Sequence, residues 1–200
     1  MIPLTLFLSL FAAPPQEEEF KNTKEAMQAV QDVLIGKFRC TGTWGDRKKE
    51  GWLEKISWSF KIKDEEYSLR MTAEKSPLFK RVVLRYNLKE KRYELDATTP
   101  EGKSHTYIGN RTGKNLTLER TDEAKGENER LVYVLLRFNR YLLRVERKPV
   151  SSSFWRVIAS VGCTKEGVPF VRESNGPKCI VTGGYGSMTL DYKGKTYYIC

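Results

Sequence analysis

Two cysteines near the end of this 200-residue chain have a spacing that could serve metal binding. Cys179 and Cys200 are separated by twenty residues, and thiolate sulfurs are good ligands for soft ions such as Cu(I) and Zn²⁺. Between them, residues 188–192 and 196–199 have the composition of two short strands on either side of Lys193-Gly194, a pair typical of a tight turn. Such a hairpin would bring Cys200 back towards Cys179, so the sequence predicts that the two sulfurs converge.

The residues around this cysteine pair also follow a recurring order. Cys179 leads, and a Tyr-x-Gly-x-x-Tyr-Tyr-x-Cys ending runs from Tyr192 to Cys200. Residues 176–200 therefore resemble the TRASH family of heavy-metal-binding domains and the related YHS domain. The resemblance implies a bound heavy-metal ion, zinc or Cu(I). Members of that family carry another cysteine four residues further on, whereas the sequence given ends at Cys200, and we expect the natural chain either to extend or to complete the site elsewhere.

The number of ligands leaves several arrangements open. Zinc normally takes four ligands, whereas two thiolates can suffice for linear Cu(I). Cys163, Cys40, His105 or a second molecule could supply the rest. Alternatively, Cys179 and Cys200 form a disulfide that staples the hairpin in an oxidising compartment. Four cysteines permit three pairings, among which the sequence does not choose. We expect Cys40 and Cys163 to be small buried residues in or near strands, and His105, the one histidine, to lie on a sheet face.

Catalytic motifs are missing from the sequence. It contains no nucleotide-binding P-loop, no Gly-x-Ser-x-Gly elbow, no His-Glu-x-x-His and no Cys-x-x-Cys. We therefore expect a protein that is not an enzyme.

The net charge of +10 is spread thinly along the chain. The first fifty residues balance, and the densest basic stretch, from Arg137 to Lys148, is interleaved with strand-like hydrophobic residues. Nucleic-acid-binding proteins usually concentrate Lys and Arg on one face together with stacking aromatics. We therefore expect this stretch to lie mainly on a solvated sheet face, and we expect no nucleic-acid partner.

The N-terminus has the character of an export signal. Residues 2–13 are almost continuously apolar, and charge first appears at Glu17. The run is well short of the ~20 residues that cross a bilayer as a helix, so we expect no transmembrane anchor. Residues 1–15 instead predict a signal peptide and an exported, periplasmic or extracellular protein, although no Lys or Arg precedes the apolar run. A buried N-terminal segment is the alternative.

The rest of the sequence predicts a scaffold that is mainly β. A helical stripe occupies residues 17–36, and the period then changes to two, with short strand-like runs about ten residues apart through 37–163. We expect an antiparallel up-and-down barrel or a curved sheet, with a two-sheet sandwich as the alternative. The opening helix, Gly36-Lys37-Phe38 and the glycine-containing first strand resemble the entry to lipocalin-like barrels. Residues 122–129, which lack a large apolar side chain, predict a mobile loop, 164–176 a linker, and 177–200 the cysteine module.

Two functions remain open from these patterns. In the first, the exported barrel carries a thiolate module that binds a soft heavy-metal ion through Cys179 and Cys200, with Cys163 as a further candidate ligand. In the second, the cysteines are structural and the barrel binds a small apolar ligand, because barrels of about eight or more strands can enclose a pocket. Nothing in the sequence indicates an oligomeric state.

Overall fold

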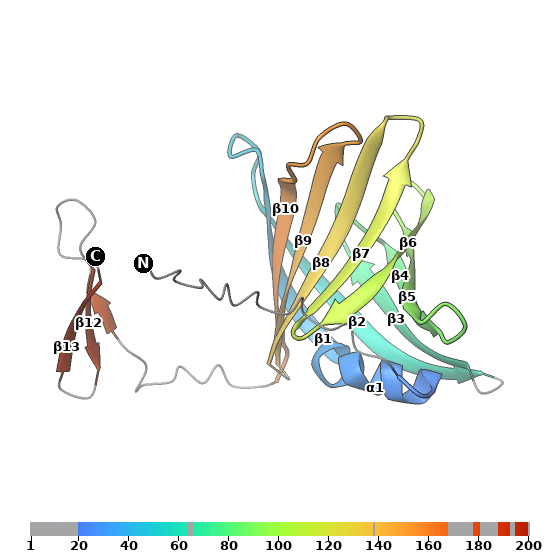
Figure 1. Cartoon of the computed structure of the whole chain (residues 1–200), viewed down its shortest axis with the longest axis horizontal. Helices are drawn as coiled ribbons and strands as arrows, with labels where there is room; N and C mark the ends of the chain where they lie inside the picture. Colours follow the sequence, from blue (N-terminus) through green and yellow to red (C-terminus); the bar gives the residue numbers. More distant parts are fainter. Residues whose placement is uncertain are drawn as a thin grey trace, which may run out of the picture. The chain divides into compact units, whose positions relative to one another are not determined.

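Antiparallel strands make up most of the computed structural model (Figure 1). It describes residues 20–63, 66–137, 139–167, 178–180, 188–192 and 195–199. The chain divides into two units, residues 1–166 and 167–200, which are described separately below. The segments expected as signal peptide (1–15) and most of the expected linker (164–176) lie outside the described residues, as does Cys200.

The first unit is a closed barrel of ten antiparallel strands. Each strand pairs with the next along the chain, and the last pairs with the first, which confirms the predicted up-and-down meander and rules out the sandwich. This architecture is consistent with a lipocalin-like barrel. The strands are β1 (Gly36–Trp44), β2 (Trp52–Lys63), β3 (Glu66–Glu74), β4 (Arg81–Asn87), β5 (Arg92–Thr98), β6 (Ser104–Thr112), β7 (Asn115–Asp122), β8 (Glu127–Arg137), β9 (Arg140–Pro149) and β10 (Arg156–Lys165).

The period of two in the sequence places the core inside the barrel. Successive side chains of a strand point to opposite faces, and the inward positions are occupied mainly by aromatic and aliphatic residues. In β1, for example, Phe38 and Cys40 are buried while Lys37 and Arg39 are not. The largest of the fully buried side chains are Tyr93, Tyr107, Tyr133, Tyr141 and Phe38. Bulky rings therefore fill much of the interior.

Gly42 makes room for a tryptophan at the β1–β2 pair. Gly42 and Trp52 face each other in the register, and a Cβ atom on Gly42 would lie 2.0 Å from Cε2 of Trp52. The indole of Trp52 consequently lies against β1 and contacts the Trp44 ring, with the ring centroids 4.7 Å apart.

Helix α1 (Thr23–Leu34) covers one end of the barrel (Figure 1). It begins at Thr23, later than the expected start at residue 17, because the Asn22 side chain accepts a hydrogen bond from the Glu25 N–H at 2.8 Å and caps the first turn. The Tyr93 hydroxyl donates to the Ala26 carbonyl at 2.7 Å and ties the helix to β5. Its buried face consists of Ala26, Met27, Val30 and Leu34. Among the described helical residues, no stretch is long and apolar enough to cross a membrane.

Half of the segment expected as a mobile loop, residues 122–129, is strand. β7 extends to Asp122 and β8 begins at Glu127, so only residues 123–126 form the connection. The prediction was wrong because it treated the absence of large apolar residues as a sign of a loop. In fact Glu129 faces the barrel interior and is only 4% exposed.

The second unit contains a three-stranded antiparallel sheet of β11 (Lys178–Ile180), β12 (Met188–Tyr192) and β13 (Lys195–Ile199). β12 and β13 are the two strands expected from the sequence, paired from Met188 with Ile199 to Tyr192 with Lys195. Cys179 lies in β11, opposite Leu190 of the central strand.

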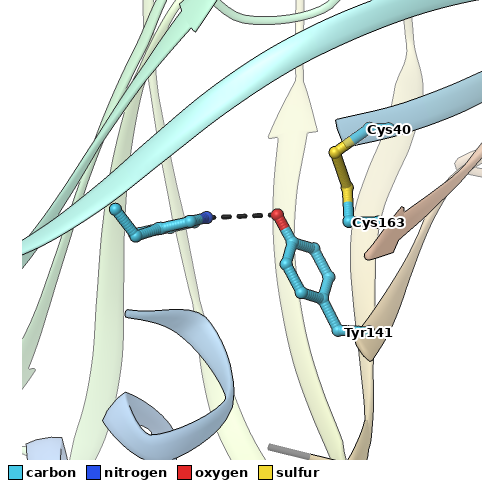
Figure 2. Close-up of a disulfide and its surroundings, with 4 residues drawn as sticks. Cys40, Tyr141 and Cys163 are labelled. Atoms are coloured by element: carbon cyan, nitrogen blue, oxygen red, sulfur yellow. Dashed lines mark hydrogen bonds between the residues drawn. A yellow bond between two sulfur atoms is a disulfide. The ribbon is translucent and has the colours of Figure 1, made fainter. Parts of the chain in front are cut away.

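A disulfide joins the two strands that close the barrel. Cys40 of β1 and Cys163 of β10 are direct partners in the register, are 2% and 1% exposed, and are bonded to each other (Figure 2). The structure thus selects one pairing where the sequence left three open, and it confirms that both cysteines are buried in strands. Because the bond spans 123 positions of the chain, it constrains the unfolded chain strongly.

Replacing both cysteines, as Cys40→Ser with Cys163→Ser, should lower the free energy of unfolding of the barrel by about 3–5 kcal/mol, the size expected for a loop of this length. Urea unfolding without reductant measures the change. Cys179→Ser is the matched control and should leave the barrel transition unchanged, because Cys179 belongs to the other unit. Equal stability of the double variant and the parent chain would show that the bond does not form in solution.

Candidate functional site

The cysteines predicted to bind metal have different surroundings. Cys163 is bonded to Cys40, so neither sulfur is a thiolate in this oxidised state and neither can add a ligand to the expected metal site. Cys179 lies in β11, and Cys200 lies outside the described residues. Within those residues, no group of three or more His, Cys, Asp or Glu side chains is arranged to hold a metal ion. The proposed roles of Cys179 and Cys200 stay predictions.

The barrel offers a different candidate site at the end opposite α1. A cavity of about 440 Å³ opens there, in the size range of small-molecule sites. We call it the mouth cavity. Its lining includes the apolar side chains of Trp44, Pro77, Leu78, Phe79 and Val145 on one hand, and the ionic side chains of Arg120, Glu129 and Arg147 on the other. An apolar wall therefore meets a polar cluster in one hollow.

The polar cluster is a row across three neighbouring strands. Glu129 of β8 stands opposite Arg120 of β7 and opposite Arg147 of β9 in the register. Nε of Arg147 donates to Glu129 Oε2 at 2.5 Å, and Nε of Arg120 donates to Oε1 at 3.2 Å. The Tyr107 hydroxyl of β6 also donates to Oε1, and the Arg120 guanidinium lies over the Tyr107 ring, 5.5 Å from its centroid. We call these four residues the Glu129 cluster.

These partners keep Glu129 ionised although it is buried. Burial by itself raises the pKa of the Glu129 carboxyl, but the Tyr107 hydroxyl and the guanidinium groups of Arg147 and Arg120 outweigh it and leave that pKa below its ordinary value. Burial and the Glu129 charge raise the pKa of Tyr107, so its hydroxyl stays protonated and remains a donor. The cluster is thus a fixed set of charges at the base of the mouth cavity.

Deeper in the barrel, aromatic side chains occupy the space. Nε1 of Trp58 on β2 donates to the Tyr141 hydroxyl of β9 at 3.1 Å (the dashed line in Figure 2). The Tyr141 ring contacts Phe38 and Tyr133, with centroids 5.3 Å and 6.1 Å apart. Room for a ligand is therefore found near the mouth, where these rings give way to the Glu129 cluster.

His105 also lines the mouth cavity, from β6. Burial and the neighbouring charge of Arg120 lower the pKa of His105 below its ordinary value, so the imidazole is neutral at pH 7. From the sequence, His105 was one of the groups that could complete the metal site. In the structure it can instead donate or accept a hydrogen bond at the rim of this cavity.

A second inward glutamate, Glu54, has a raised pKa, in contrast to Glu129. Glu54 of β2 is 8% exposed, and its Oε2 atom has no hydrogen-bond partner among the described residues. Burial raises the pKa of the Glu54 carboxyl above its ordinary value. The pKa values of two glutamates on the inner face of the barrel are therefore shifted in opposite directions, because Glu129 is paired with arginines and Glu54 is not.

Sequence analysis did not identify the Glu129 cluster. Arg147 belongs to the basic stretch that we expected on a solvated sheet face, yet it points inward to Glu129. Other members of the stretch do lie outside: Arg144 is half exposed and pairs with Glu146 at 3.5 Å. The period-two alternation through Tyr141, Leu143 and Val145 was the available signal, because it puts position 147 on the same face as these buried residues.

The two glutamates give a matched pair of pH predictions. Above pH 4.5, the ordinary pKa of a Glu side chain, an ionised Glu54 disfavours folding. Glu54→Gln should therefore raise the free energy of unfolding at pH 7 and have little effect at pH 4.

Glu129 has a lowered pKa, so the stability that its ionised form contributes is present above pH 4.5 and is lost as the pH falls through its folded-state pKa.

Glu129→Gln should accordingly lower the free energy of unfolding at pH 7 by about 3 kcal/mol, because it leaves two arginines without their buried partner. The loss should shrink on acidification. Urea unfolding of both variants across this pH range measures the two effects. Shifts of the same sign at pH 7 would contradict the assigned environments.

Comparison with known proteins adds no relative to this description. No family model matches the sequence, and no curated protein matches it significantly. The resemblance of the C-terminal segment to TRASH and YHS domains stays a prediction.

Proposed function

We propose that the barrel is a non-enzymatic binding protein for a small amphiphilic molecule, which enters at the mouth cavity. The observation that supports this most directly is that one cavity of ligand size joins an apolar wall to the buried Glu129 cluster. Sites for small molecules are typically apolar with a few placed polar groups that fix orientation. The mouth cavity has such an apolar wall but a more polar remainder, because Glu101, Lys103, Asp122 and Lys125 also line it.

The Glu129 cluster refines the expectation of a purely apolar ligand. Burying an apolar group against Arg120, Arg147 and Glu129 would remove water from charged atoms and give nothing in return. A ligand with a polar head and an apolar body avoids this cost, because the head can hydrogen-bond to the cluster while the body lies along Leu78 and Phe79. We therefore propose an amphiphile rather than a hydrocarbon-like ligand.

The fluorescent amphiphile 1-anilinonaphthalene-8-sulfonate is a suitable first probe, because it combines fused rings with an anionic group. Leu78→Ala removes part of the apolar wall and should weaken probe binding by about tenfold, which corresponds to the free energy of burying part of one leucine side chain. Leu88→Ala is the matched control. Leu88 is 44% exposed and lies beyond β4 at the α1 end of the barrel, so this variant should bind the probe like the parent chain.

Probe fluorescence titrations provide these affinities, and native mass spectrometry of gently purified protein tests for a co-purified natural ligand. If the Leu78→Ala and Leu88→Ala variants bound the probe equally, the mouth cavity would not be the binding site.

We also propose a separate function for the C-terminal unit, namely binding of a soft metal ion by the thiolates of Cys179 and Cys200. It is supported by the antiparallel pairing of β12 with β13, the two strands predicted between the cysteines, and by the use of Cys40 and Cys163 in the barrel disulfide. That disulfide also supports export to an oxidising compartment, where such bonds persist. The binding proposal requires that Cys179 and Cys200 themselves remain reduced.

Isothermal titration of the full chain with Cu(I) and with Zn(II) tests this proposal. Cys179→Ala should abolish high-affinity binding, whereas the double variant Cys40→Ser, Cys163→Ser should retain it if the barrel disulfide takes no part. Prior thiol labelling and mass spectrometry establish whether Cys179 and Cys200 are reduced. Unchanged binding by Cys179→Ala would exclude this module as the metal site.

A further inference from the structure

The connection between β9 and β10, residues 150–155, carries an unusual concentration of exposed apolar surface. Seven large hydrophobic residues are exposed in the described part of the chain. Two of them, Val150 and Phe154, lie in this connection, and a third, Val157, follows at the start of β10. Phe154 is 84% exposed, the highest value among the seven. Single exposed hydrophobic residues are common on soluble proteins, but a local cluster that includes an aromatic ring marks an interaction surface.

Hydrogen bonds hold this connection in place, so the exposure of Phe154 is built into the loop. The Phe154 N–H donates to Ser152 Oγ at 3.1 Å, and the Ser152 N–H donates to the Pro149 carbonyl at 3.0 Å. The Val150 N–H donates to the Gly126 carbonyl at 2.9 Å and ties the loop to the β7–β8 connection. The loop therefore presents Phe154 to solvent from a defined conformation.

The neighbouring Trp155 is anchored against the barrel by two cations. The Arg130 guanidinium lies 4.1 Å from the ring centroid and the Lys148 ammonium lies 4.9 Å from it. These two contacts fix the base of the loop and place positive charge next to the exposed apolar residues.

Positive charge extends along the rim on both sides of this loop. A hollow of about 620 Å³ beside Phe154 is lined by Arg147, Lys148 and Arg156, with Glu127 as its one acidic residue. An adjacent hollow of about 640 Å³ shares Arg147 and Arg156 and adds Lys49 together with Asp46. Arg147 is paired with Glu129, so we call the other three cations, Lys49, Lys148 and Arg156, the basic rim. These three cations exceed the two acidic residues that line the same hollows, Asp46 and Glu127.

We propose that the loop 150–155 and the basic rim dock the barrel mouth on an anionic lipid surface. Basic residues are attracted to the negative potential of such a surface, and an adjoining aromatic side chain gains by entering the boundary between headgroups and acyl chains. The β9–β10 connection lies at the end of the barrel opposite α1 (Figure 1), and Phe154 lines one hollow together with Lys148 and Arg156. This placement would orient the mouth cavity towards the membrane, but the docking itself does not depend on any ligand in that cavity.

Co-sedimentation of the full chain with vesicles tests the proposal, using phosphatidylcholine alone and a 3:1 mixture of phosphatidylcholine with phosphatidylglycerol. We expect preferential binding to the anionic vesicles that weakens at high salt. Phe154→Ser should reduce this binding by about tenfold, through loss of the inserted ring. Arg156→Ala, which removes one exposed rim charge, should reduce it by about fivefold.

Leu88→Ser is the matched control for Phe154→Ser, because it removes an exposed hydrophobic side chain at the opposite end of the barrel. It should bind vesicles like the parent chain, and so should Leu78→Ala, which separates docking from the ligand proposal. All variants share the same N-terminal apolar residues, so differences among them report on the rim. Thermal unfolding checks that each variant is folded.

Unchanged vesicle binding by both Phe154→Ser and Arg156→Ala would overturn the proposal. It would also be overturned if Phe154→Ser altered the sedimentation coefficient in the absence of lipid and left vesicle binding intact, since a second copy of the chain would then be the partner of this loop.

Discussion

Hydrogen bonding between β1 and β10 closes the sheet, and the remaining features of the barrel depend on that closure. The pairing runs from Phe38 opposite Lys165 to Trp44 opposite Ala159, and it joins strands that are distant in sequence. Closure removes exposed strand edges, which otherwise favour aggregation. It also fixes which side chains face inward on every strand. The Cys40–Cys163 bond lies on this seam, so the covalent link acts where the entropic cost of bringing the chain ends together is greatest.

Once the barrel is closed, its two ends acquire different chemistry. At one end α1 supplies apolar side chains, and the hydroxyl of Tyr93 satisfies a helix carbonyl. At the other end the inward positions of β7, β8 and β9 carry Arg120, Glu129 and Arg147, in which one carboxylate pairs with two guanidinium groups across strands. Glu54 has no such partners, and its raised pKa indicates a position where the barrel gives up stability. The Glu54 carboxyl is available to hydrogen-bond to a bound molecule, whereas the Glu129 carboxylate is already bonded to protein side chains.

Local patterns in the sequence predicted most of the strands, but they carry no information on which distant side chains become partners. Alternation over residues such as Trp58 and Phe60 depends on the side chains of a single strand, so it was sufficient for the meander and for the β12–β13 hairpin. The Glu129 cluster joins positions 9, 18 and 22 residues apart. Three of its members fall in separate strand-like runs and Glu129 falls in the segment expected as a loop, so no local pattern links them. The disulfide likewise depends on a register between strands 123 positions apart, which cysteine spacing does not encode.

The basic stretch from Arg137 to Lys148 shows why linear charge density is a poor guide to an anion-binding surface in a barrel. Strand alternation sends Arg147 inward, where it is neutralised by Glu129, and Arg144 outward, where it pairs with Glu146. Lys148 stacks on Trp155. The cations of the basic rim come from separate segments: Lys148 lies near the end of β9, and the β1–β10 pairing brings Lys49 and Arg156 to the same rim. Closure of the sheet therefore gathers these cations on one rim, although the net charge is spread thinly along the sequence.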